Sequence, residues 1–149
     1  MKISQMMNKH CVFLDVKDNN KRQFLQNISK KVADIIKIDE RAIFDALLER
    51  ENLGSTGFGE GTAIPHARID GIDKAWAFLA KLQSPIDFES VDNKPVDLAF
   101  FLISPEGSGA DHLTALAQIS RILKDEALCK KIRKEEDSET VFALLSNID

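Results

Sequence analysis

The residue of this chain best suited to chemistry is His66, which follows Pro65 at the end of the stretch GSTGFGEGTAIPHA, residues 54–67. Near neutral pH an imidazole keeps a lone pair available, so a histidine can act as a nucleophile or a proton acceptor. Proline has a fixed φ and restrains the residue before it to an extended backbone, so the imidazole is presented from a stiffened segment. We therefore take His66 as the candidate nucleophile.

His112 is a candidate partner of this nucleophile, because it is predicted to lie in the first turn of a helix over residues 109–124. Ser108 and Asp111 form a weak capping-box pattern at the start of that helix. The positive end of a helix dipole disfavours imidazolium, and the free backbone N–H groups there suit an anion. The predicted apolar face of the same helix carries Leu113, Leu116, Ala117, Ser120 and Leu123.

Arg50 is the third candidate, at the end of a predicted helix over residues 39–52 that stops before Gly54. A cation is favourable in the last turn of a helix whatever the function. Two histidines, an arginine and a helix N-terminus that converge would hold a phosphoryl group well, since its transfer depends mainly on positioning and charge stabilisation.

The four glycines within residues 54–61 invite comparison with phosphate-binding loops, but neither common motif fits. Thr62 occupies the place of the third glycine in a dinucleotide fingerprint, and the Gly-Lys-Ser/Thr of a P-loop does not occur in the sequence. We expect the glycines to let the backbone turn closely around an incoming group, with tight turns alone as the alternative.

Short apolar runs alternate with amphipathic patterns, which predicts one α/β domain over residues 1–149, with a central mixed sheet. The run over residues 95–105 is apolar on both alternating faces, as in a strand with helices above and below the sheet. The predicted strands are 11–16, 74–82 and 95–105, and the predicted helices are 18–36, 39–52, 109–124, 125–135 and 138–148.

The amino-acid composition limits the kinds of molecule that this protein is expected to bind. The formal net charge is -4 and the lysines are scattered among acids, so we expect no binding to nucleic acid. The sequence has no signal-peptide core and no run of eighteen apolar residues, so we expect a cytoplasmic protein without membrane insertion.

Four stretches carry a family resemblance: LGSTGFGEGTAIPHA, SPIDFESVDNKPVDLAFFLISP, DHLTALAQISRIL and DEALCKKIRK. They are similar to enzyme IIA proteins of the fructose/mannitol type (type 2) in the bacterial phosphoenolpyruvate-dependent phosphotransferase system, and the similarity covers about residues 40–135. Thr62 departs from the family signature, where an aliphatic residue is usual. The residues that match it are Glu51, Phe58, Gly59, Ala63, Ile64, Pro65, His66 and Ala67.

The resemblance implies a role for each candidate residue. His66 is the residue that would become phosphorylated, His112 looks like the family's second active-site histidine, and Arg50 looks like its phosphate-neighbouring arginine. The implied fold is that of the family, a mixed and mostly parallel sheet with helices on both faces. The family chemistry requires no ATP, metal or organic cofactor.

The stretches ENLGSTGFGEGTAIPHARID and VDNKPVDLAFFLISP look most like the nitrogen-regulatory branch. This implies an HPr-like carrier (NPr or HPr) as phosphate donor, and regulatory targets such as sensor kinases or transporters. Two alternatives stay open: a sugar-specific protein that passes phosphate to a IIB domain, and a regulatory binding module that does not turn phosphate over.

Two smaller questions also stay open at this point. A metal-dependent hydrolase that uses His66, His112 and Asp111 is disfavoured, because the sequence lacks a local two-ligand spacing such as His-x-x-x-His. The apolar neighbours Phe58, Ile64 and Ile69 could form a docking rim for a carrier or could anchor the loop in the core.

Overall fold

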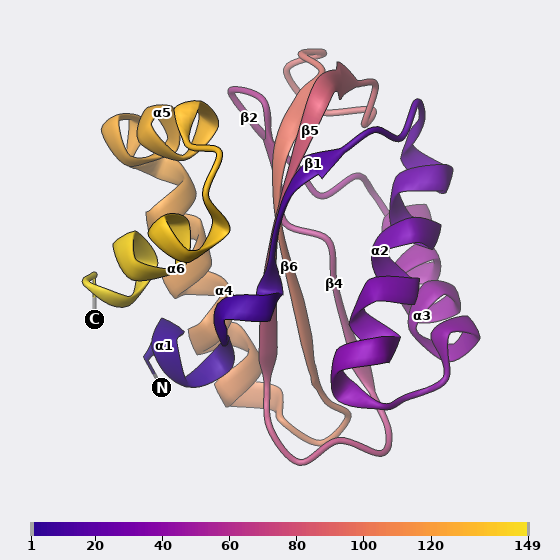
Figure 1. Cartoon of the computed structure of the whole chain (residues 1–149). Helices are drawn as coiled ribbons and strands as arrows, with labels where there is room; N and C mark the ends of the chain where they lie inside the picture. Colours follow the sequence, from indigo (N-terminus) through magenta and orange to yellow (C-terminus); the bar gives the residue numbers. More distant parts are fainter. Residues whose placement is uncertain (1, 149) are drawn as a thin grey trace.

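The computed structural model describes residues 2–148 as one six-stranded sheet between two layers of helices (Figure 1). Helices α2 (Lys21–Ile36) and α3 (Glu40–Asn52) lie on one face of the sheet. The opposite face carries α1 (Ile3–Met6), α4 (Gly109–Lys124), α5 (Glu126–Lys134) and α6 (Ser138–Ser146), and a 3-10 turn, Lys9–Cys11, leads into the first strand. The predicted α/β fold with helices on both faces is confirmed.

The sheet is mixed, with three parallel and two antiparallel pairings. Its order is β1-β5-β6-β3-β2, and β4 also pairs with β6. Strand β6 is buried along almost its whole length, as its apolar sequence predicts. The strands are β1 (Val12–Val16), β2 (Gly57–Gly59), β3 (Thr62–Ala63), β4 (His66–Ile69), β5 (Trp76–Ile86) and β6 (Val96–Pro105).

Strands β3 and β4 run along β6 in one constant register, with Thr62 opposite Leu98 and His66 opposite Leu102. They therefore form one line beside β6 that is interrupted at Pro65, which has no N–H to donate to a ladder. Strand β2 pairs with the outer side of β3, whereas β4 lies at the edge of the sheet. The Pro65 carbonyl still accepts the Leu102 N–H at 3.0 Å, so the chain stays on the sheet through the break. His66 thus opens a strand and does not lie in a flexible loop.

The glycine-rich segment forms the β2–β3 hairpin, which differs from the expected loop around a phosphoryl group. A Cβ on Gly57 would lie 2.2 Å from the Ser90 Oγ, so this glycine allows close packing against another segment. Gly61, with φ at 79°, lies in the hairpin turn. Gly54 is the glycine whose carbonyl binds a candidate site residue, Arg50.

Helix α4 begins and ends as predicted, but only part of the predicted apolar face lies in the core: Leu123 is buried, Leu116 is half-buried and Ala117 is exposed. Leu113 is 67% exposed, because apolar residues occupy two overlapping stripes of this helix and the other stripe faces the sheet. Ser108 precedes the helix, yet its hydroxyl donates to the Pro105 carbonyl at 2.6 Å and caps no N–H. The buried residues of α4 are His112, Ala115, Ile119, Ile122 and Leu123.

No helix within residues 2–148 combines the length and apolar character needed to cross a bilayer.

Candidate active site

The structure brings His66, His112 and Arg50 together at the edge of the sheet. Because β4 is an edge strand, α3 on one face and α4 on the other can both reach its first residue. The Arg50 Nε lies 3.3 Å from the His66 Nε2, and the two imidazole centroids are 5.5 Å apart. The three side chains line one open groove of about 580 Å³.

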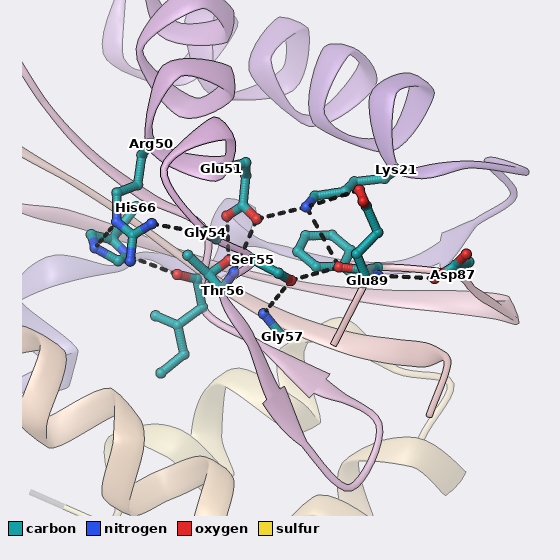
Figure 2. Close-up of polar contacts among 12 residues, drawn as sticks. Lys21, Arg50, Glu51, Gly54, Ser55, Thr56, Gly57, His66, Asp87 and Glu89 are labelled. Carbon is teal, nitrogen blue, oxygen red and sulfur yellow. Dashed lines mark hydrogen bonds and ion pairs between the residues drawn. The ribbon is translucent and has the colours of Figure 1, made fainter. Parts of the chain in front are cut away.

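The tautomer of His66 follows from its two neighbours (Figure 2). Its Nδ1 lies 2.8 Å from the Ile64 carbonyl, which can only accept, so Nδ1 carries the proton. Its Nε2 receives a hydrogen bond from Arg50, which can only donate, so Nε2 carries the lone pair. The nitrogen that lies toward Arg50 is therefore the one with a lone pair available for chemistry.

Electrostatics keep His66 neutral. Burial lowers the pKa of His66 below its ordinary value, and the positive charges of Arg50 and Arg68 act in the same direction. The hydrogen bond to the Ile64 carbonyl and the charge of Glu51 oppose this shift without reversing it. A neutral imidazole with a lone pair on Nε2 is consequently the form present near neutral pH.

His112 is buried beside this nucleophile, in the first turn of α4 as predicted. Its Nδ1 lies 2.7 Å from the hydroxyl of Ser104 on β6, which fixes the ring orientation. Burial, followed by the charges of His66 and Arg68, lowers the pKa of His112 to about 4. His112 is thus a second imidazole that is neutral near neutral pH.

Arg50 is half-buried in the last turn of α3, where the helix C-terminus favours a cation. Its Nη1 donates to the Gly54 carbonyl at 2.8 Å while its Nε donates to His66. The guanidinium is held in one orientation by two neutral acceptors, and its charge remains available to an anion.

Two residues of the site were not singled out from the sequence. Arg68 is exposed, lies two positions after His66 on the same face of β4, and lines the groove. Residues two positions apart in a strand point to the same face, so the sequence could indicate Arg68 only if residues 66–69 were known to form a strand. Ser104 is fully buried and is a lone hydroxyl within the apolar run of β6, which could have indicated a buried polar partner.

Exposed apolar side chains lie around the groove or close to it. Leu53 is 82% exposed and Leu113 is 67% exposed, and both line the groove, while Phe58 is 37% exposed beside a neighbouring hollow that also reaches His66. Ile64 and Ile69 are buried, so for these two the core interpretation is correct.

The site defined by this geometry is a histidine with an unprotonated Nε2, next to a guanidinium and a second neutral histidine. Such a group can accept an electrophile and stabilise the negative charge that comes with it. Within residues 2–148 no three His, Cys, Asp or Glu side chains gather closely enough to hold a metal ion.

Comparison with known proteins assigns this chain to a family. The family model described as "Phosphoenolpyruvate-dependent sugar phosphotransferase system, EIIA 2" matches residues 5–148, and the chain belongs to that family. Proteins of this family take part in phosphoryl transfer and interact with other proteins of the phosphotransferase system.

Relatives in sequence and structure agree with this assignment. The chain is 43% identical over 146 residues to the nitrogen regulatory protein of Bradyrhizobium diazoefficiens, which covers 98% of this chain and 95% of the relative. The crystal structure of nitrogen regulatory protein IIA-Ntr from Neisseria meningitidis matches 96% of this chain and 98% of its own, with a TM-score of 0.90 and 28% identity. The mannitol IIA structure from Escherichia coli shares the fold, with a TM-score of 0.78 at 18% identity, over 93% of this chain and 97% of its own.

Proposed function

We propose that this protein is a phosphocarrier that accepts a phosphoryl group onto the Nε2 of His66 from a phosphohistidine of an HPr-like carrier, NPr or HPr. The observation that carries the proposal is the pair of opposed contacts on the ring. The Ile64 carbonyl accepts a hydrogen bond from Nδ1–H, and Arg50 donates one to the lone pair of Nε2.

The reaction on these residues needs no proton transfer. The Nε2 lone pair of His66 attacks the phosphorus, a new N–P bond forms, and the N–P bond of the donor breaks with its electron pair returning to the donor imidazole. Nδ1 keeps its proton, hydrogen-bonded to the Ile64 carbonyl, so the phosphorylated ring is an imidazolium whose positive charge is balanced by the phosphoryl oxygens. The donor ring, protonated on its other nitrogen, leaves as a neutral imidazole.

Arg50 and His112 stabilise the transferred group. Arg50 can turn its Nε–H from the imidazole to a phosphoryl oxygen, and His112 lies close enough across the groove to bind another oxygen. A loose phosphoryl transition state needs positioning and charge more than covalent help. Loss of either residue should therefore slow the transfer, whereas loss of His66 should abolish it.

The apolar rim formed by Leu53, Leu113 and Phe58 suits a carrier protein that must bring its own histidine into contact and then leave. The nitrogen-regulatory role, and regulatory targets such as sensor kinases or transporters, are part of the proposal, and the names of the relatives support them. We also propose a cytoplasmic location, without an organic or metal cofactor.

The test is phosphorylation in a reconstituted chain of phosphoenolpyruvate, enzyme I and the HPr-like carrier. We expect acid-labile phosphate on the wild type and none on His66→Ala. His10→Ala is the matched control, because His10 is exposed in the N-terminal segment, and it should accept phosphate as the wild type does. Normal acceptance by His66→Ala would refute the proposal.

The same assay separates the alternatives. A wild-type protein that takes up no phosphate, yet binds a regulatory target, would be a binding module. Efficient onward transfer to a fructose or mannitol IIB domain would indicate the sugar-specific role instead of the regulatory one.

A further inference from the structure

Residues 53–56, which we call the strap, connect α3 to β2 and hold both reactive groups (Figure 2). The Gly54 carbonyl accepts the Nη1–H of Arg50 at 2.8 Å. The Thr56 carbonyl accepts the N–H of Ile64 at 3.0 Å. The Ile64 carbonyl in turn accepts the Nδ1–H of His66. The position of the strap therefore affects both sides of the Nε–Nε2 contact.

Glu51, one residue after the arginine, ties the strap to the helix end. It is 5% exposed, and its Oε1 accepts the Thr56 N–H at 3.0 Å while its Oε2 accepts the Thr56 hydroxyl. The Lys21 Nζ, from the start of α2, lies 2.9 Å from Oε1. A buried carboxylate is tolerated only with such partners, so the three contacts form one unit.

The strap is also fixed from the segment that follows β5. The Ser55 hydroxyl donates to the Phe88 carbonyl at 2.6 Å and accepts the Gly57 N–H at 3.0 Å. Lys21 reaches the same Phe88, with its Nζ 3.5 Å from the carbonyl and 4.6 Å from the ring centroid. Lys21 of α2 thus contacts both Glu51 and Phe88, and Phe88 is the residue that binds Ser55 of the strap.

The ion pair between Glu51 and Lys21 also leaves the charge of Arg50 without a carboxylate partner within residues 2–148. Glu51 uses Lys21 as its cation, and the hydrogen bonds of Arg50 go to neutral acceptors, so the neighbouring guanidinium keeps its charge for an anion. The charge of Glu51 also raises the pKa of His66, against the larger lowering by burial.

We propose that Glu51 is a positioning residue: its buried carboxylate, paired with Lys21, fixes the strap and thereby the contact between Arg50 and the reactive histidine. The inference rests on the proposed function of His66 as phosphoryl acceptor. Glu51 touches neither the phosphoryl group nor the imidazole, and it acts through Thr56 and the strap.

The test compares Glu51→Gln with Glu89→Gln. Glu89 is the other carboxylate near Lys21, 3.8 Å away, but its side chain is 77% exposed and the strap does not depend on it. We expect Glu51→Gln to slow phosphoryl acceptance by about tenfold or more, since small displacements of reacting groups have effects of that order. Glu89→Gln should stay within about twofold of the wild type.

A second readout uses the unphosphorylated protein. In ¹⁵N spectra of the imidazole rings, Glu51→Gln should move His66 away from a pure Nδ1–H tautomer and lower its pKa relative to the wild type, and Glu89→Gln should change neither. Unchanged rates, or a slower rate with unchanged His66 signals, would overturn the inference.

A third variant, Thr56→Val, tests the inference if Glu51→Gln does not fold. Thr56→Val keeps the ion pair and the backbone bond to Glu51 but removes the hydroxyl contact, and we expect a smaller loss of rate in the same direction, with the His66 signals shifted likewise. Rates and ring signals like those of the wild type would again contradict the role. If the wild type accepts no phosphate at all, the proposed function fails, while the ring spectra still decide whether Glu51 positions His66.

Discussion

Arg50 donates from two different nitrogens, Nη1 to the Gly54 carbonyl and Nε to His66, and a lysine cannot reproduce this fork. We expect Arg50→Lys to lower the rate of phosphoryl acceptance by about 10- to 100-fold while leaving the free energy of unfolding within about 1 kcal/mol of the wild type. Rapid-quench measurement with phosphorylated carrier gives the rate.

Arg41→Lys is the control for this change, because Arg41 lies on the same helix, its side chain is 80% exposed, and it pairs with Asp45 on the helix surface. It should behave as the wild type. Equal rates for Arg50→Lys and Arg41→Lys would mean that positive charge near α3 is sufficient and that the fork has no role.

The three candidate residues could be found from sequence because each has a local signal: a proline before His66, a helix start before His112 and a helix end at Arg50. Their mutual contacts could not, since they depend on β4 lying at a sheet edge. The Nδ1–H tautomer was also out of reach, because a backbone carbonyl two residues earlier, that of Ile64, determines it.

Helix α4 has one face in the core and one toward the groove. Substitutions on these two faces should have different effects on the free energy of unfolding. Ile119 is fully buried, so Ile119→Ala should lower the free energy of unfolding by about 2–5 kcal/mol. Leu113→Ala, at a position that is 67% exposed, should change it by less than about 0.5 kcal/mol. Urea unfolding measures both, and a larger effect at Leu113 would show that the face predicted from the sequence is the correct one after all.

Most elements, such as β6 and α4, are predicted correctly from the sequence, and the exceptions include the shortest strands. Strands β2, β3 and β4 have two to four residues each, too few for a periodic signal, so the sequence predicts a loop in this segment. In α4 the apolar residues form two overlapping stripes, and only packing against the sheet decides between them.

The stability of the whole molecule should depend on pH through His112. Its pKa falls from 6.5 to about 4 in the native protein because burial disfavours the imidazolium. Between these values the unfolded chain binds a proton that the native state does not, so the free energy of unfolding falls as pH is lowered through this window. The lowered pKa of His66 acts in the same direction.

The expected loss from His112 alone is roughly 2–3 kcal/mol between pH 7 and pH 4.5, and it should be missing in His112→Gln. Urea unfolding at both pH values gives the difference for each protein. Carboxylates titrate alike in the two proteins, so only the difference in slope is compared. Parallel pH profiles would show that His112 is not held neutral by burial.

The site of the N–P bond in the phosphorylated protein decides whether the proposed chemistry is right. Protein labelled with ¹⁵N at histidine, phosphorylated through the carrier and studied by ³¹P–¹⁵N correlation spectroscopy, should show phosphorus bonded to Nε2 of His66, with the Nδ1 proton retained. Phosphorus on Nδ1 of His66, on His112, or on no histidine at all would contradict the mechanism.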